Sequence, residues 1–158
     1  MDEACVFCER IQRHATAPDP DTICEFRNSI AYLGRWQFYQ GYTVLVAKVH
    51  ATELDQLTDR VRHEFLDEMC TVARVIGLEF QPSKLNYELL GNQVPHLHWH
   101  IFPRYANDEH VHLPVWLDTA AAERDPSLAL RFEQGRVSRS TTIQLLRTAL
   151  VKWAIHTD

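Results

Sequence analysis

The stretch HLHWHIFP, residues 96–103, decides how this chain folds. Histidine alternates with an apolar residue through its first six positions, and a period of two is that of a β-strand with one polar and one apolar face. We therefore predict a strand over 96–103 with His96, His98 and His100 on one side. Such regular spacing favours a function for the three imidazoles over a half-exposed strand that happens to carry histidines.

The segments around this strand predict an α+β domain. Apolar residues recur every three or four positions in 60–80, which is typical of a long amphipathic helix. Short strands flank that helix in hairpin-like pairs, which favours a mainly antiparallel sheet. Further strands are expected at 22–26, 29–34, 43–48 and 84–91, and further helical segments at 5–14, 126–134 and 140–156.

Composition limits the classes of function. The chain has 158 residues, 46% of them hydrophobic, which fits a single domain over 1–158. The net charge of −5 argues against binders of nucleic-acid polymers or anionic membranes, which need many cationic contacts. No apolar run approaches the ~20 residues of a membrane span, and the acidic start MDEACVFCERIQRH carries no signal-peptide core. We expect a cytoplasmic protein.

The four cysteines are expected to be thiols or metal ligands rather than disulfides. Cys5 and Cys8 form a C-x-x-C motif, which by itself fits half-buried thiols, a redox pair or half a zinc site. The redox interpretation expects a strand ahead of the motif, and only four residues precede it here. Cys24 and Cys70 lie among apolar residues and are predicted to be buried.

Two kinds of chemistry suit the histidine strand. In a regular strand the Cα atoms of His96 and His100 lie roughly 13 Å apart. A histidine with its metal bond reaches about 6–7 Å, so all three imidazoles fit one ion poorly, whereas a metal on two of them, or on one with ligands from elsewhere, is feasible. Alternatively, a neutral imidazole is a good nucleophile at pH 7, and neighbouring imidazoles can donate hydrogen bonds to phosphate oxygens. The central histidine, His98, suits attack on phosphorus.

The segment HLHWHIF, residues 96–102, resembles the His-φ-His-φ-His-φ-φ signature of the histidine triad (HIT) superfamily, where φ is apolar. The longer segment LNYELLGNQVPHLHWHIFPRY is similar to the bacterial HIT hydrolase branch, which is related to diadenosine polyphosphate hydrolases and the fragile-histidine-triad protein. The resemblance covers about residues 5–104 and leaves 105–158 as a C-terminal extension. It implies a HIT-like antiparallel sheet with the long helix and a C-terminal helix packed on it.

The resemblance also implies an activity and a partner. It implies a homodimer that hydrolyses, or transfers from, the α-phosphate of dinucleoside polyphosphates or other nucleotidyl compounds. His98 corresponds to the nucleophile that forms a nucleotidyl-histidine, which water then cleaves. His100 corresponds to the supporting donor, and His96 is the first member of the triad. Asn92 and Gln93 match polar residues that contact the phosphates.

The same resemblance gives the C-x-x-C motif a role. Bacterial relatives hold a structural zinc ion with ligands that correspond here to Cys5, Cys8, His50 and His96. Two thiolates and two imidazoles are a sound set for closed tetrahedral zinc. Zinc-free buried thiols are the alternative. Mg²⁺ is a further expected ion, accompanying the phosphates of the substrate.

Two positions depart from the family pattern. Tyr42 stands where the family often has histidine, and Gly34 stands where it often has an aspartate or asparagine that contacts the ribose. Aromatic residues at Trp36, Phe38 and Tyr39 are either compensating base-stacking groups or buried structural residues. These departures leave open a non-catalytic nucleotide-binding HIT protein. The metal chemistry of the HxHxH strand separately leaves open a metal-dependent hydrolase or oxygenase that uses His96 and His98.

Overall fold

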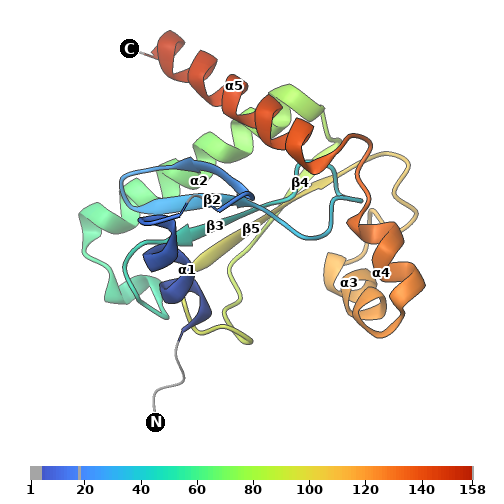
Figure 1. Cartoon of the computed structure of the whole chain (residues 1–158), viewed down its shortest axis with the longest axis horizontal. Coiled ribbons are helices and arrows are strands. Elements are labelled where there is room, and N and C mark those ends of the chain that lie inside the picture. The colour runs from blue at the N-terminus through green and yellow to red at the C-terminus, as the bar shows by residue number, and fades with distance from the viewer. Residues whose placement is uncertain (1–4, 18, 158) are drawn as a thin grey trace.

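A five-stranded antiparallel sheet in the order β1-β2-β3-β5-β4 organises the computed structural model, which describes residues 5–17 and 19–157 (Figure 1). The strands are β1 (Thr22–Glu25), β2 (Ser29–Leu33), β3 (Thr43–Ala47), β4 (Lys84–Glu88) and β5 (His98–Arg104). The helices are α1 (Val6–His14), α2 (Asp59–Phe80), α3 (Val115–Arg124), α4 (Pro126–Glu133) and α5 (Arg139–Thr157), with a 3₁₀ turn at Leu54–Gln56. The predicted α+β class is confirmed.

Alternation along the strands gives the sheet two different faces. On one face, Leu45 and Ile101 pack with Phe65 and Ile76 of α2 and with Leu146 of α5 in the largest apolar cluster. Most of these side chains are fully buried, and truncating a buried residue of this size typically costs about 2–5 kcal/mol. Figure 1 shows α2 behind the sheet and α1 in front of it.

The opposite face carries two smaller clusters. Ile30 and Tyr32 of β2 pack with Phe7 of α1. Further along, Phe102 of β5 packs with Phe132 of α4 and with residues that include Trp36 and Tyr39. Trp36 and Tyr39 are therefore buried structural aromatics. A stretch of this face lies between α1 and the α3–α4 pair, and the alternation of β5 directs His98 and His100 toward it.

The long helix α2 agrees closely with the predicted 60–80. Thr58 caps its first turn, because its hydroxyl accepts a hydrogen bond from the Val61 N–H. Gln81 ends it in the left-handed conformation, with φ of 49°, and Pro82 follows. Cys70 lies on its exposed face, so the prediction that Cys70 is buried is wrong. All four cysteines are free thiols.

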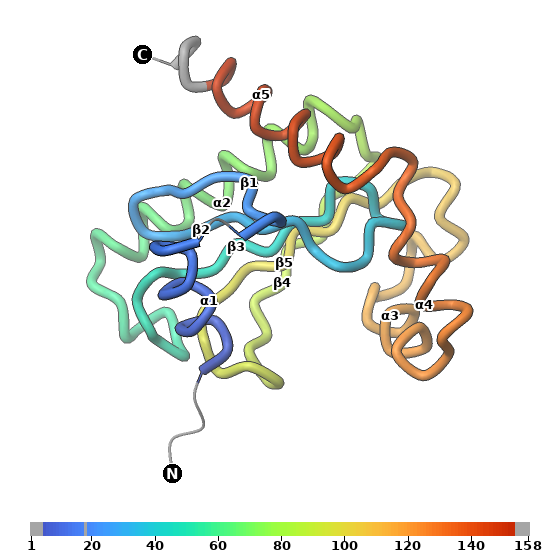
Figure 2. Tube along the Cα trace, in the orientation of Figure 1, coloured from blue at the N-terminus to red at the C-terminus, as the bar shows by residue number. Residues whose placement is uncertain are grey.

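Two predicted boundaries are off by more than one residue, and one helix is absent from the prediction. Strand β5 begins at His98 rather than at 96, and β4 ends at Glu88 rather than at 91. Helix α3 was not predicted. The chain leaves β5, loops outward and returns to α3, as Figure 2 shows. Within the described residues, no helix has the length and apolar character needed to cross a membrane.

Candidate functional site

The first triad histidine lies outside the strand that holds the other two. The Leu97 N–H donates to the Ala51 carbonyl at 2.7 Å, and the Leu97 carbonyl accepts from the Ala47 N–H at 3.0 Å. These bonds tie the chain ahead of β5 to the end of β3, and His96 turns its ring toward α1. The prediction that His96 belongs to the same strand as His98 and His100 is therefore wrong, although the rings of His96 and His98 both contact Phe7 of α1. The main chain of His96 still reaches the site.

Hydrogen bonding defines the reactive nitrogen of His98. The Nδ1 atom lies 2.6 Å from the main-chain oxygen of His96. A carbonyl only accepts hydrogen bonds, so Nδ1 carries the hydrogen and Nε2 of the neutral ring carries the lone pair. Burial lowers the pKa of His98. The ring therefore presents an unprotonated Nε2 at neutral pH, which is the form a nucleophile needs.

His100 lies beside that nitrogen. Its Nε2 atom is 3.0 Å from Nε2 of His98, and its Nδ1 atom is 2.7 Å from the hydroxyl of Tyr42. Burial, followed by the neighbouring His98, lowers the pKa of His100 to about 3. Trp116 of α3 meets the His100 ring edge-on, with the ring centroids 5.0 Å apart.

Two cavities share Phe7 and His100. The first, which we name the arginine cavity, has a volume of about 460 Å³. Its charged lining residues are Arg10, Arg35 and Arg139, together with Asp21 and Glu133, with which they form ion pairs.

The second cavity, named the α3 cavity, has a volume of about 380 Å³ and also includes His98. Its wall contains Asn92 and Gln93, so the structure brings both predicted phosphate contacts to the same hollow as His98. Glu123 is its one charged lining residue among the described residues, apart from any charge on the histidines.

Helix α3 supplies a wall that the sequence analysis missed. Trp116, Thr119, Ala120 and Glu123 all line the α3 cavity. The indole N–H of Trp116 donates to the carboxylate of Glu88, a residue of β4 that pairs with His100 across the sheet. The proline at 114 and the alanine run after it were a local signal for the helix, but no local signal placed the helix against His100.

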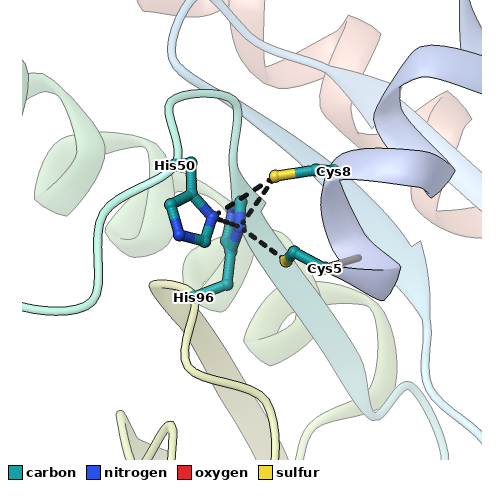
Figure 3. Close-up of side chains that lie close together, drawn as sticks. All are labelled: Cys5, Cys8, His50 and His96. Atoms are coloured by element: carbon teal, nitrogen blue, oxygen red, sulfur yellow. Dashed lines mark hydrogen bonds between the residues drawn. The ribbon is translucent and has the colours of Figure 1, made fainter. Parts of the chain in front are cut away.

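Four predicted metal ligands converge at the start of α1 (Figure 3). The ligand atoms of Cys5, Cys8, His50 and His96 all lie within 4.8 Å of one another. Nδ1 of His96 is 3.4 Å from Sγ of Cys5, 3.6 Å from Sγ of Cys8 and 3.2 Å from Nδ1 of His50. Tetrahedral zinc with bonds of ~2.0–2.3 Å places its ligand atoms roughly 3.3–3.8 Å apart.

The second ring nitrogen of His96 is also arranged for metal binding. Nε2 lies 2.7 Å from the Ala47 carbonyl, so it carries the hydrogen and leaves Nδ1 as the ligand atom. Burial is the main cause that lowers the pKa of His96. The neighbouring His50 and His98 lower it further, and the hydrogen bond to the Ala47 carbonyl opposes them. The donor set and its spacing therefore fit a structural zinc ion.

Comparison with known proteins gives a consistent family. The HIT domain matches residues 17–107. The chain is 30% identical over 112 residues to "Protein hit" of Bacillus subtilis, covering 68% of this chain and 75% of that protein. It is 26% identical over 114 residues to "Adenosine 5'-monophosphoramidase hnt1" of Schizosaccharomyces pombe, covering 68% and 78% respectively.

Solved structures share the fold along most of the chain. A zinc-bound histidine triad family protein from Mycobacterium smegmatis superposes with a TM-score of 0.69 at 21% identity, covering 97% of both chains. A HIT family protein from Bacillus subtilis gives a TM-score of 0.60 at 28% identity, covering 82% of this chain and 92% of that one. The first match includes the C-terminal helices, which lie beyond the HIT domain match.

Proposed function

We propose that this chain, which belongs to the HIT family, is a nucleotide hydrolase or nucleotidyl transferase with His98 as its nucleophile. Its membership follows from the HIT domain, which matches residues 17–107, more than half of the chain. The observation that carries the proposal is the unprotonated Nε2 atom of His98. It lies at a cavity wall beside a second imidazole, and the 2.6 Å bond to the His96 carbonyl holds the ring.

The proposed reaction has two displacements at the α-phosphorus. Nε2 of His98 forms a bond to phosphorus while the bond from phosphorus to the leaving group breaks, and the leaving group departs with the electron pair and a proton from solvent. The His96 carbonyl accepts from Nδ1–H and stabilises the positive charge that develops on the imidazole. Water then attacks phosphorus, releases its proton to solvent and restores Nε2. His100, and Asn92 and Gln93 at the rim, are proposed donors to the phosphate oxygens.

The lining of the α3 cavity favours one class of leaving group. Glu123 lies in its wall, Trp116 and Ala120 are apolar, and the part of the chain that the structure describes contributes no Lys or Arg to the lining. A departing nucleotide would bring several negative charges into this hollow, whereas an amine would bring none. We therefore rank nucleoside phosphoramidates above dinucleoside polyphosphates as substrates. The name of the Schizosaccharomyces pombe relative, an adenosine monophosphoramidase, points the same way.

The test compares initial rates on an AMP amide and on diadenosine polyphosphates for the wild type, His98→Asn and a control. The exposed His63 of α2 supplies the control, His63→Asn. We expect His98→Asn to lose at least about 10³-fold in kcat, because it lacks the nucleophile. Intact-mass spectrometry should find an acid-labile nucleotidyl adduct on wild type alone. Full activity of His98→Asn would exclude the mechanism.

The same assays separate the alternatives. A metal-dependent hydrolase predicts activity that chelators abolish and added metal restores, with no covalent adduct. A binding protein predicts tight AMP binding without turnover on any compound. Activity in the absence of added Mg²⁺ decides whether that ion accompanies the substrate.

Cys5, Cys8, His50 and His96 are proposed to hold one structural zinc ion. Such an ion supplies cross-linking and no catalysis, since its four positions are filled by protein. It would fasten α1, which carries Phe7 to both cavities, onto the ends of β3 and β5. Metal analysis of protein purified without chelators tests the assignment.

A homodimer in the cytoplasm is the proposed state of the protein. Strand β4 is an edge of the sheet and exposes Tyr87, and an unprotected edge strand is prone to pair with another chain. Light scattering should give twice the mass of the 18.4 kDa chain, and Tyr87→Lys should shift the mass toward the monomer. A monomeric wild type at micromolar concentration would exclude the dimer.

A further inference from the structure

We propose that Tyr42 is the positioning residue for His100. Its hydroxyl fixes which nitrogen of that imidazole carries the hydrogen, and its ring packs against Gly34, which has no side chain. The proposal rests on the function proposed for His98. It assigns a role in that reaction to a residue that touches neither phosphorus nor leaving group.

The hydrogen-bond series leaves one arrangement for neutral rings. Nδ1 of His98 must donate to the His96 carbonyl, so Nε2 of His98 has only a lone pair. The 3.0 Å contact between the two Nε2 atoms then requires the hydrogen to be on His100. Nδ1 of His100 is left as an acceptor, so the Tyr42 hydroxyl must be the donor in their 2.7 Å contact.

Packing holds the phenol ring of Tyr42 in the orientation that places its hydroxyl at Nδ1 of His100. It stacks on Phe102, with the ring centroids 3.8 Å apart and the planes 9° from parallel, and its residue is only 4% exposed. Gly34 lies under the ring: a Cβ there would be 2.8 Å from Cγ of Tyr42 and closer to two other ring atoms. Any side chain at position 34 would displace the ring.

The hydroxyl also stays protonated. Burial, followed by the carboxylate of Glu88, raises the pKa of Tyr42. Tyr42 is thus a fixed donor to Nδ1, and that bond keeps the other hydrogen of His100 on Nε2. Nε2 of His100 contacts Nε2 of His98, and both residues line the α3 cavity, so the N–H of His100 is available to a phosphate oxygen of a substrate bound beside His98. The opposite tautomer would present a lone pair to both, and two lone pairs repel.

The experiment uses Tyr42→Phe, which keeps the ring and its packing against Gly34. Long-range ¹H–¹⁵N spectra of protein with ¹⁵N-histidine report which ring nitrogen of His100 carries hydrogen. We expect hydrogen on Nε2 alone in wild type and a measurable share of the Nδ1–H tautomer in Tyr42→Phe, because only the contact with His98 then favours hydrogen on Nε2. We expect kcat on the AMP amide to fall roughly tenfold, the equivalent of one neutral hydrogen bond, while KM changes less than about threefold.

The matched control is Tyr105→Phe. The Tyr105 hydroxyl is buried and donates to the Gln40 carbonyl at 2.6 Å, so this variant also loses one buried phenol bond, away from both cavities. It should lose comparable stability and keep the wild-type spectrum and kcat.

Two results would overturn the proposal. An unchanged His100 tautomer in Tyr42→Phe would show that the hydroxyl does not fix the ring, whatever happens to the rate. A shifted tautomer with unchanged kcat would show that the tautomer has no part in the reaction. If wild type turns over none of the compounds, the proposed function fails instead, and the spectra still decide whether Tyr42 sets the tautomer.

Discussion

At the residue scale, the site depends on keeping two imidazoles uncharged and differently protonated. Burial lowers the pKa of both His98 and His100. A main-chain carbonyl and a phenol then set the positions of their hydrogens. Such an arrangement has a measurable consequence for stability, because an imidazole in the unfolded chain has an ordinary pKa of ~6.5.

The first prediction is a loss of stability in acid that His100 causes. Its pKa is about 3 in the folded protein, so between pH 6.5 and 3 the unfolded chain binds a proton that the native protein does not. The contribution of neutral His100 to the free energy of unfolding is fully present above pH 6.5 and falls by up to about 1.4 kcal/mol per pH unit below it. His100→Asn lacks the contribution. Urea unfolding at pH 7 and pH 5 should show the two proteins converging in acid, and parallel pH dependence would contradict the prediction.

A second residue-scale prediction concerns the packing of the Tyr42 ring against Gly34. Gly34→Ala places a methyl group into the phenol ring and should cost about 1–3 kcal/mol in the free energy of unfolding, as overpacking does. The cost should be much smaller in a Tyr42→Ala background, because the ring is then gone. A double-mutant cycle of unfolding free energies measures the coupling, and additive effects would show that the two positions are independent.

At the element scale, one buried arginine ties the segment after β5 to the sheet. Arg104 is 1% exposed and donates to the Asp108 carboxylate at 2.6 Å, to Asn86 of β4 at 3.0 Å and to the Leu113 carbonyl at 2.8 Å. These bonds fix both ends of the loop that leads into α3. The wall of the α3 cavity is therefore held by an anchor at the end of the histidine strand.

The element-scale prediction is that Arg104→Met destabilises the protein by about 3–5 kcal/mol, because it leaves the buried Asp108 carboxylate unpaired. Chemical unfolding measures the loss. Arg104→Met combined with Asp108→Leu removes both charges and should recover much of it. As a control, Arg35→Met breaks an ion pair with Glu133 whose partners are both more than a third exposed, and it should cost less than about 1 kcal/mol. Equal losses in the two single variants would contradict the argument.

At the scale of the whole molecule, α1 covers the sheet face that carries the site and contributes Phe7 to both cavities. Its first turn joins two segments distant in sequence, at His50 and His96, through the proposed zinc ligands. Metal binding and the shape of the site are therefore expected to be linked.

The whole-molecule prediction is one zinc ion per chain, whose removal by a chelator lowers the melting temperature by at least about 5 °C, since a ligated metal contributes directly to folding. Cys8→Ser should weaken zinc binding and raise KM for the nucleotide, because α1 loosens. Cys70→Ser changes an exposed thiol and should leave both unchanged. A chelator-treated protein with unaltered melting temperature and KM would count against the link.

Local patterns in the sequence determined the sheet class and helix α2, whereas the candidate zinc ligands came from the resemblance to the HIT superfamily. Alternation at 96–102 and the three-to-four spacing in 60–80 depend on residues close along the chain, so they can be read without a structure. Strand β5 begins at His98 rather than at His96 because the Leu97 N–H donates to the Ala51 carbonyl instead of to β3.

Only the tertiary structure decided the geometry of the candidate site. The contacts of His100 with Tyr42 and Trp116, and of His96 with Cys5, join residues far apart in the chain. Which imidazole nitrogen carries hydrogen depends on the partner at each end of the ring, and packing of the sheet and helices selects that partner. A sequence names the titratable groups, whereas their protonation follows from burial and from neighbours that only the folded chain brings together.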